Sequence, residues 1–282
     1  MPPTPNETKQ ALTPALSRST GRGGNAGNAF NLARLRPALK PFRLHWFPRL
    51  RSTNDHAIAM RKRGELFAPA VVLTGHQLAG RGRGSNTWWS GPGTLTVTFA
   101  LPVEDRLAPY QVPLIAGLAA RAATAEVVGD DAIQLKWPND LLHRGRKLAG
   151  LLCERVDKAD LIGLGLNVNV EPSRAPKSLR ERITSLSDIA GRPIDVTNAL
   201  ATIAQHVHRL LARRDELSFT QLLREYDRHH ALIGKRVTVI GTGDNGPVSG
   251  RCDGLDGNGR LLLRHRGKLN RVIAGQVQLL EN

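Results

Sequence analysis

Between residues 70 and 170 the chain reads as a series of strands interrupted by one helix, and this order limits the fold more than any other feature. Apolar side chains alternate with threonine from Thr94 to Leu101, which is the two-residue period of a half-buried strand. An alanine-rich stretch with helical spacing follows at 114–128. The other strand patterns lie at 70–74, 133–137, 141–155 and 161–170. The sequence therefore predicts an α+β fold, with a mixed β-sheet flanked by helices.

The end of the chain has a different pattern. Two amphipathic helix patterns, at 197–213 and 218–229, precede a change in composition near residue 231. Short apolar runs separated by glycine-rich turns follow. About fifty residues of short strands predict a small β-barrel of the SH3-like type. We therefore expect a larger domain over 45–230 and an SH3-like C-terminal domain over 231–282.

Positive charge is dense at the start of the chain. The whole sequence has 40 Lys and Arg residues against 24 Asp and Glu residues, which gives a formal net charge of +16. Residues 1–44 contain seven basic residues and one acidic residue, among many prolines and glycines. No helical or alternating period is visible there before about Phe30. We predict a disordered basic extension over 1–44, which is either a solvated tail or a nucleic-acid-binding arm.

Composition argues against several classes of protein. No uninterrupted apolar stretch approaches the roughly 20 residues of a membrane-spanning helix, and the N-terminus lacks the apolar core of a secretory signal. Cys153 and Cys252 are far apart and form no Cys-x-x-Cys motif, so neither a disulfide framework nor a thiolate zinc site is predicted. These features favour a reducing, cytoplasmic location. The histidines of 206–208 and 229–230 lack metal-site spacing, and we interpret them as helix-surface residues.

The segment Gly80–Gly91 carries the strongest candidate chemistry. Its alternating glycines let the backbone approach a ligand closely, and Arg81 and Arg83 suit phosphate or carboxylate groups. Trp88 and Trp89 can stack on a base or close a pocket. The glycine spacing matches neither the dinucleotide-binding fingerprint nor a P-loop. The alternatives are a flexible surface loop and an RNA-binding Arg/Gly segment.

Two further motifs follow this segment. In Lys136–Asp140 (Lys-Trp-Pro-Asn-Asp) a strand ends at a proline, and an amide and a carboxylate emerge together. Asp140 is a candidate for a water-mediated Mg²⁺ contact, and Lys147 returns on the hairpin as a compact positive charge. In Gly163–Asn169 the glycines within a strand indicate a bulge or a close approach. The simpler interpretations are a turn with a solvated Arg/Lys pair and a kinked core strand.

Five motifs occur together in an order that resembles the biotin protein ligases. They are Ser52-Thr53-Asn54, Gln77–Arg83, Lys136–Asp140, Arg146–Gly150 and Gly163–Asn169. The resemblance extends from about His45 to the C-terminus, and it implies a class II synthetase-like biotin/lipoate ligase fold. The implied enzyme is a ligase that forms a C–N bond. Biotin and ATP with Mg²⁺ give biotinyl-5′-AMP, and a lysine of the biotin carboxyl carrier protein of acetyl-CoA carboxylase then attacks this adenylate. Neither step needs an enzyme nucleophile, so catalysis depends on positioning and charge stabilisation.

The resemblance also implies residue roles. Lys147 and Arg83 are the implied catalytic residues, which stabilise negative charge on the biotin carboxylate and the α-phosphate. The implied biotin site comprises Ser52, Thr53, Asn54, Gln77, Arg81, Gly82, Arg83 and Lys147. The implied ATP and adenylate site comprises Gly80, Trp88, Asn139, Asp140 and Asn167, with Asp140 holding Mg²⁺ through water.

The chain departs from the family pattern in two places. Gly84-Ser85-Asn86 follows Arg83 where the common family loop has a second Gly-Arg pair, which leaves fewer positive charges over the phosphates. Residues 1–44 show no winged-helix pattern, so we expect a monofunctional ligase without specific DNA binding and without membrane association. The family includes both monomers and homodimers, and the sequence does not decide between them.

Two alternatives to the biotin ligase hypothesis remain open on the sequence alone. The first is a lipoate-type ligase of the same fold, although such enzymes are expected to lack the Lys-Trp-Pro-Asn-Asp motif. The second is a basic nucleic-acid-binding protein that uses the N-terminal extension, the arginine loop and the tryptophan pair. This second hypothesis leaves the strand Gly163–Asn169 without a role.

Overall fold

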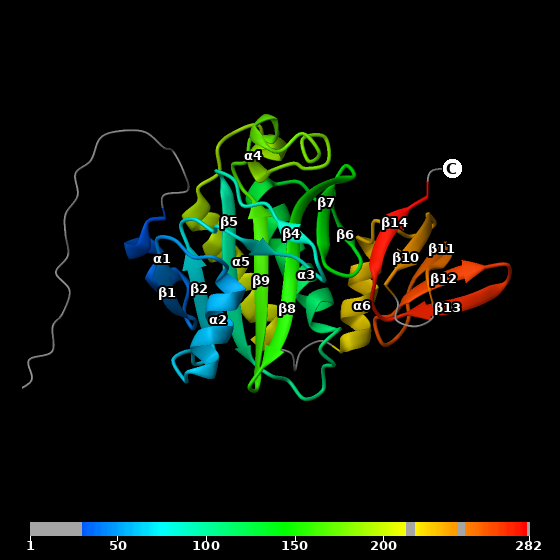
Figure 1. The fold of residues 1–282 in the computed structure, drawn as a ribbon, viewed down its shortest axis with the longest axis horizontal. Helices are drawn as coiled ribbons and strands as arrows, with labels where there is room; N and C mark the ends of the chain where they lie inside the picture. The colour runs from blue at the N-terminus through cyan, green and yellow to red at the C-terminus, as the bar shows by residue number, and fades with distance from the viewer. Residues whose placement is uncertain (1–29, 213–217, 242–245, 281–282) are drawn as a thin grey trace, which may run out of the picture.

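A seven-stranded mixed sheet forms the centre of the computed structural model, which describes residues 30–212, 218–241 and 246–280 (Figure 1). The strands, in their order across the sheet, are β1 (Arg43–Phe47), β2 (Ala70–Thr74), β5 (Thr94–Pro102), β9 (Ala159–Asn167), β8 (Arg146–Val156), β7 (Asp140–His143) and β6 (Ile133–Lys136). β1 and β2 run parallel, whereas the other neighbouring strands run antiparallel. The predicted mixed sheet is therefore confirmed.

The two faces of this sheet are covered differently. The helices are α1 (Leu32–Ala38), α2 (Thr53–Lys62), α3 (Val112–Val128), α4 (Leu186–Ala190), α5 (Val196–Ala212) and α6 (Phe219–Arg228), with a short 3₁₀ turn at Pro172–Arg174. The rear face packs against α3 and α5 around the main hydrophobic core, to which Val71 and Leu73 contribute. The front face carries a smaller apolar cluster in which Val72 packs with Ala57 and Met60 of α2. Alternate residues of one strand thus supply both cores, as the pleat requires.

The front face is only partly covered, and this leaves room for a site. α2 begins at the cap residue Ser52, whose side chain accepts a hydrogen bond from the Asp55 N–H. Beside α2, the two-stranded ribbon of β3 (Gly80–Arg81) and β4 (Thr87–Trp88) arches over the sheet (Figure 1). Among the described residues, none of the helices has both the length and the apolar character that crossing a bilayer requires.

Residues 30–44 correct the prediction of a disordered extension over 1–44. Leu35 of α1 and Leu39 just after it are fully buried in the main core, and Arg43 begins β1. The Asn31 N–H donates to Thr197 Oγ1 at the start of α5, at 3.0 Å. This order comes from contacts with a helix that is distant in the sequence, so a local pattern does not reveal it. The rest of the predicted extension, residues 1–29, lies outside the described residues.

The C-terminal part is a five-stranded antiparallel sheet. Its strands are β13 (Lys268–Val272), β12 (Leu261–His265), β11 (Val248–Leu255), β10 (Arg236–Ile240) and β14 (Gln276–Leu279), in spatial order. The predicted small SH3-like barrel is thus seen as a five-stranded antiparallel sheet, and within the described residues no pairing of the edge strands β13 and β14 closes it.

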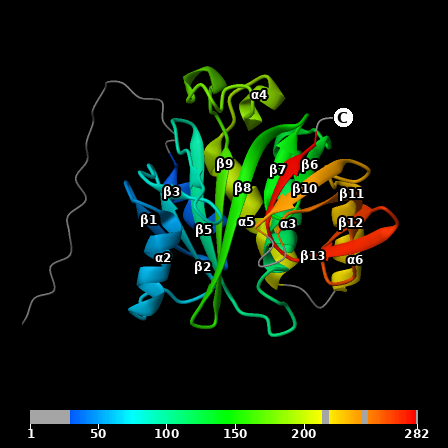
Figure 2. The same ribbon diagram turned by 45° about the vertical axis from the view of Figure 1, so that its right-hand side comes forward.

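Side-chain to backbone hydrogen bonds join this C-terminal sheet to the larger domain. Trp137 Nε1 donates to the Gly259 carbonyl at 3.2 Å, and Gln111 Nε2 donates to the Asn258 carbonyl at 3.0 Å. In the turned view, β10 and β14 lie next to β6 and β7 (Figure 2). The C-terminal sheet therefore forms one wall of the space above the front face.

Candidate active site

A large cavity opens on the front face, between α2, the β3–β4 ribbon, the β6–β7–β8 hairpins and the C-terminal sheet. Its volume is about 1150 Å³, ample for a drug-sized ligand. The sequence-predicted residues that line it are Ser52, Thr53, Asn54, Gln77, Arg81, Gly82, Arg83, Trp88, Asn139, Asp140 and Lys147. Gly80 and Asn167, which were also predicted, do not line the cavity. Five motifs that are separate in the sequence thus meet in one place.

The Ser52-Thr53-Asn54 motif forms one end of the cavity, at the start of α2. The Thr53 N–H donates to Gln77 Oε1 at 2.9 Å, which holds the glutamine beside the helix. Gln77 Nε2 in turn donates to Ser90 Oγ at 3.1 Å. This end is therefore a compact set of hydroxyl and amide groups, suited to a small polar heterocycle with both donors and acceptors.

Asn54 is hydrogen-bonded to two strands of the sheet, β5 and β8, and lies against a third, β9. Its Oδ1 accepts from Thr98 Oγ1 of β5 at 2.6 Å. Its Nδ2 donates to the Leu152 carbonyl of β8 at 3.0 Å and to Glu154 Oε2 at 2.8 Å. A Cβ atom at Gly163 of β9 would lie 2.2 Å from Asn54 Oδ1. The glycine predicted to mark a close approach therefore makes room for the asparagine.

Trp88 lies across the middle of the cavity, over the second glycine of β9. A Cβ atom at Gly165 would lie 2.3 Å from Trp88 Cε2. The Lys147 ammonium lies 5.7 Å from the centroid of the Trp88 ring, which is within cation–π range. Trp88 Nε1 is buried and has no hydrogen-bond partner among the described residues. Gly80 of β3 allows the Trp88 backbone to approach, because a Cβ atom at this position would lie 2.5 Å from the Trp88 carbonyl oxygen.

The two arginines of the β3–β4 ribbon have different surroundings. Arg81 forms ion pairs with Asp55 Oδ1 at 2.6 Å and with Glu154 Oε2 at 2.7 Å. Arg83 is more buried, and its Nη1 donates to the Gly275 carbonyl of the C-terminal sheet region at 3.2 Å. Burial lowers the pKa of Arg83, although the nearby Asp140 carboxylate opposes that shift. Arg83 thus places a weakly compensated charge inside the cavity.

The β6–β7–β8 hairpins supply the charged floor of the cavity. Asp140 begins β7, and its Oδ1 lies 2.7 Å from Lys147 Nζ of β8. Lys136 ends β6 and pairs in register with Asp140. Burial lowers the pKa of Lys136, the Asp140 carboxylate opposes this, and the positive charges of Lys147 and Arg182 lower it further. One carboxylate is therefore shared by several cations.

Asn139 and Asn167 hold the backbone around these charges. Asn139 Nδ2 donates to the Leu151 carbonyl at 2.7 Å, which fixes the turn after Pro138 to β8. Asn167 Nδ2 donates to the Thr184 carbonyl at 3.0 Å and more weakly to the Lys147 carbonyl at 3.4 Å. Asn139, which lines the cavity, therefore fixes the turn beside Asp140, and Asn167, which does not line it, supports the backbone at Lys147.

The cavity also contains charged residues that the sequence analysis did not single out. These are Lys136, Glu181, Arg182 and Lys235. Lys136 lies within a quoted motif, so the motif itself could have drawn attention to it. Arg182 and Lys235 lie in irregular segments whose pattern gives no such signal. Only the folded chain brings Arg182 and Lys235 to the same cavity as Lys147.

The donor set bears on the predicted Mg²⁺. Within the described residues no group of three or more His, Cys, Asp or Glu side chains is placed to hold a metal ion. Mg²⁺ bound through nucleotide phosphates needs only one or two carboxylates from the protein. Asp140 fits that second kind of site, since it is the carboxylate of the β6–β7–β8 floor.

Cys153 has no nucleophilic character here. Its thiol is free and partly buried on β8. Burial raises the pKa of this thiol, and the carboxylates of Asp160 and Glu154 raise it further. A thiolate nucleophile is therefore disfavoured at this position.

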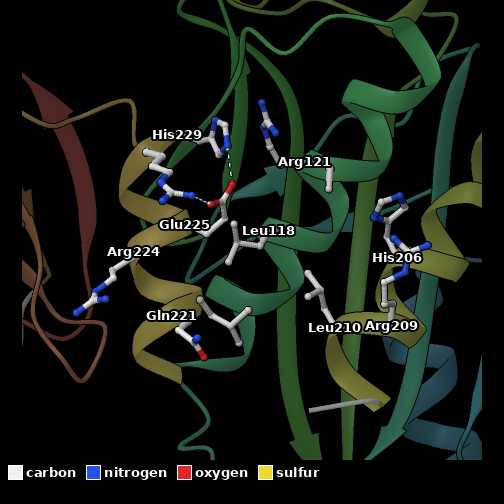
Figure 3. A pocket seen from close by; sticks show the side chains of 12 residues that line it. Leu118, Arg121, His206, Arg209, Leu210, Gln221, Arg224, Glu225 and His229 are labelled. Carbon is white, nitrogen blue, oxygen red and sulfur yellow. Dashed lines mark hydrogen bonds and ion pairs between the residues drawn. The ribbon is translucent and has the colours of Figure 1, made fainter. Parts of the chain in front are cut away.

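A second hollow lies on the rear side, between α3, α5 and α6 (Figure 3). It measures about 530 Å³, and Figure 3 shows His229 directed toward Glu225, with Nε2 at 3.1 Å from Oε1. His206 and His230, which were predicted to lie on helix surfaces, are both buried. They face neighbouring elements, and His206 Nε2 lies 2.8 Å from Glu126 Oε2.

Comparison with known proteins places this geometry in a family. Residues 46–170 match the model of the Biotin/lipoate A/B protein ligase family, and residues 232–280 match that of the Biotin protein ligase C terminal domain. The biotin–[acetyl-CoA-carboxylase] ligase of Mycobacterium tuberculosis is 32% identical over 233 residues, which cover 80% of this chain and 85% of that protein. The second family model favours the biotin ligases over the lipoate-type alternative.

Two further relatives agree with this assignment. The bifunctional ligase/repressor BirA of Bacillus subtilis is 31% identical over 220 residues, which cover 74% of this chain but 66% of that longer protein. Among solved structures, the biotin protein ligase from Aquifex aeolicus in complex with biotin and ATP superimposes with a TM-score of 0.74 at 26% identity. That match covers 85% of this chain and 99% of the other. The chain belongs to the biotin protein ligase family.

Proposed function

We propose that this protein is an ATP-dependent biotin protein ligase. It joins biotin to ATP to form biotinyl-5′-AMP and pyrophosphate, and it then transfers the biotinyl group to a lysine of a biotin carboxyl carrier protein. The observation that carries this proposal is the convergence, in one cavity, of a polar corner at Ser52–Asn54 and a cluster of cations around Lys147. The first suits the ureido ring of biotin, and the second suits a carboxylate next to phosphates.

The reaction needs charge stabilisation more than a nucleophile. The biotin carboxylate oxygen attacks the α-phosphorus, and the bond to the β-phosphate bridging oxygen breaks. Lys147 belongs to the hairpin floor of the same cavity and lies beside Trp88, where it can neutralise the carboxylate and the α-phosphate as they approach. Arg83 enters the same space from the ribbon. Lys147 and Arg83 are therefore the proposed catalytic residues, and Trp88 is the proposed cover of the adenylate.

The remaining site assignments belong to the same proposal. Ser52, Thr53, Asn54, Gln77 and the loop of Arg81 and Gly82 bind biotin, and Asn139, Asp140, Gly80 and Asn167 serve the ATP side. Asp140 would hold Mg²⁺ through water, and the ion would neutralise phosphate charge. We also propose a cytoplasmic enzyme with no specific DNA binding. The alignments span 85% of the Mycobacterium tuberculosis ligase but 66% of the Bacillus subtilis ligase/repressor.

A reconstituted reaction tests the proposal directly. Purified protein is mixed with biotin, MgATP and the apo form of an acetyl-CoA carboxylase carrier domain, and the mass of the carrier is measured. We expect a biotin-dependent mass gain on one lysine. Parallel reactions with lipoate in place of biotin, and without ATP, should give no gain. A gain with lipoate alone, or none with biotin from folded protein, would overturn the proposal.

A further inference from the structure

The carboxylate of Glu154 contacts two residues of the proposed biotin end, although it lies outside the cavity. Its Oε2 accepts a hydrogen bond from Asn54 Nδ2 at 2.8 Å. The same oxygen accepts from Arg81 Nη2 at 2.7 Å, within an ion pair. Asn54 and Arg81 line the cavity, whereas Glu154 does not. One oxygen atom outside the cavity thus joins a residue of α2 to a residue of the β3–β4 ribbon.

The pleat of β8 places this carboxylate beside Asn54. Glu154 follows Leu152 by two residues, so both side chains lie on the same face of the sheet. Asn54 Nδ2 contacts the strand at both residues, through the Leu152 carbonyl at 3.0 Å and the Glu154 side chain. Glu154 also pairs in register with Leu161 of β9, a member of the front apolar cluster. A carboxylate next to apolar side chains loses part of its hydration, and here amide and guanidinium donors replace it.

The hydrogen-bond partners of Asn54 fix the orientation of its amide. The two Nδ2 protons are used by the Leu152 carbonyl and by Glu154, and Oδ1 accepts from Thr98 Oγ1 at 2.6 Å. A flipped amide would place its oxygen against two acceptors. Glu154 is the charged member of this set, and charge-assisted hydrogen bonds are roughly twice as strong as neutral ones. The carboxylate therefore contributes strongly to the position of Asn54.

Arg81 also pairs with Asp55, and the two carboxylates have different surroundings. The Asp55 side chain is 49% exposed, and its Oδ1 lies 2.6 Å from Arg81 Nε. The Glu154 side chain is 27% exposed. Water screens an exposed ion pair, so such a pair contributes little to stability, and screening weakens as exposure falls. We therefore expect Glu154 to hold Arg81 more strongly than Asp55 does.

We propose that Glu154 is a positioning residue for biotin, because a single carboxylate oxygen holds both Asn54 of the polar corner and Arg81 of the ribbon. With both residues held, the two sides of the biotin end are in place before biotin enters, and binding does not bear the cost of ordering them. Glu154 lies outside the cavity, so it acts through these two residues. This inference deepens the proposed function and rests on it.

Biotin affinity and the two Michaelis constants test this role. In Glu154→Ala, the Kd for biotin measured by calorimetry should rise by about 10- to 100-fold, because Asn54 and Arg81 lose a charged partner. The KM for biotin in ATP–pyrophosphate exchange should rise as well, while the KM for ATP at saturating biotin should be unchanged. Glu154→Gln should recover part of the affinity, since its amide oxygen can still accept from Asn54 Nδ2. A merely structural role would lower the thermal midpoint without separating the two KM values.

Two further variants complete the test. Asp55→Asn removes a carboxylate from Arg81 and leaves the Asn54–Glu154 hydrogen bond in place, so it should raise the Kd for biotin by less than about 5-fold. Glu65→Gln is the matched control, because Glu65 forms an ion pair with Arg63 at the same 2.7 Å and does not line the cavity. It should leave the Kd for biotin and both KM values unchanged.

The results that contradict the inference are specific. They are a wild-type Kd for biotin in folded Glu154→Ala or Glu154→Gln, equal rises in the KM values for biotin and ATP, and an effect of Asp55→Asn as large as that of Glu154→Ala. A failure of the proposed function gives a different result. Wild-type protein would then bind no biotin, which overturns the function and the inference together. Equal biotin binding by wild-type protein and Glu154→Ala overturns the inference alone.

Discussion

The hollows on the two sides of the seven-stranded sheet are both lined by basic side chains, but those charges are matched in different ways. On the rear side, buried Arg121 donates to the Ile133 carbonyl at 3.0 Å and pairs with the Asp131 carboxylate. His229 and Arg228 share Glu225. The rear arginines without such partners in the described residues, Arg209 and Arg224, are exposed to water, and Figure 3 shows Arg224 directed away from the hollow.

On the front side, the basic side chains that are least exposed lack acidic partners among the described residues. Lys136 is half-buried without an ion pair in the described residues, and partly buried Arg83 has a carbonyl as its partner. A buried cation without a counter-ion lowers the stability of the free protein. The number of basic residues in a hollow therefore does not show whether it binds an anion. The presence or absence of acidic partners for those residues is more informative.

The largest expected effect is on the front side. Lys147→Ala should lower the rate of biotinyl-AMP formation by about 100- to 1000-fold, as the loss of a preorganised charge at a developing anion does. Single-turnover release of pyrophosphate measures this rate. Because the substitution leaves Asp140 without its ion pair, the thermal midpoint of the variant should also be measured to confirm that the protein is folded. Lys177→Ala, at an exposed position outside the cavity, should keep the wild-type rate.

A pair of glycines sharpens the comparison between the faces. Gly163→Ala on the front should lower the free energy of unfolding by about 1–3 kcal/mol, because its Cβ would lie 2.2 Å from Asn54 Oδ1, which accepts a hydrogen bond from Thr98 Oγ1. It should also weaken biotin binding. Gly117→Ala on α3 meets a movable methyl of Leu135 at 3.3 Å, and should change stability little. Denaturant melts measure the free energy of unfolding, and calorimetry measures the Kd for biotin. Equal changes of both quantities in the two variants would contradict the prediction.

A rear charge should affect stability without affecting activity. Arg121→Met removes the partner of two backbone carbonyls, those of Ile133 and Asp131, and should cost about 1–3 kcal/mol of unfolding free energy. Asp131 itself is exposed, so its unpaired carboxylate adds little. The KM for ATP and the rate of adenylation should stay at wild-type values below the melting range. A loss of ATP affinity in Arg121→Met at temperatures where the variant is folded would contradict the purely structural role of the rear-side charge.

The smallest effect concerns the half-buried lysine. Since its folded-state pKa lies below the ordinary 10.5, burying charged Lys136 destabilises the fold at neutral pH, and this penalty declines as the pH rises through the lowered value. Lys136→Met should therefore raise stability by about 1 kcal/mol or less at pH 7, and the gain should shrink toward pH 10.5. Melts at several pH values measure this. If the stability gained in Lys136→Met increased with pH, the cost could not come from burying the charged form of Lys136.

Much of the fold was readable from the sequence because its signals are local. The Thr94–Leu101 alternation, the alanine-rich helix and the strand that Pro138 ends all form where they were predicted. The motif order also predicted family membership, which the comparisons confirmed. The predicted site residues mostly line one cavity, while their individual roles remain predictions.

The parts that sequence reasoning missed depend on long-range contacts. α1 has few residues and an internal proline, and its order comes from packing on α5. Arg182 lies in irregular chain and reaches the site through backbone pairing with Lys147. His230 looked like a surface residue of a helix but is covered by elements from elsewhere in the chain. In each case the deciding partner lies far along the sequence, where periodicity carries no information.

The hydrogen bond from Arg83 to the Gly275 carbonyl has a thermodynamic consequence for the molecule as a whole. The Arg83 guanidinium lines the cavity and also joins the larger domain to the C-terminal sheet through this hydrogen bond. A nucleotide that draws Arg83 toward its phosphates competes with the hydrogen bond to Gly275. Nucleotide binding and the docking of the C-terminal sheet are therefore linked: the free energy by which docking changes nucleotide affinity equals the free energy by which the nucleotide changes docking.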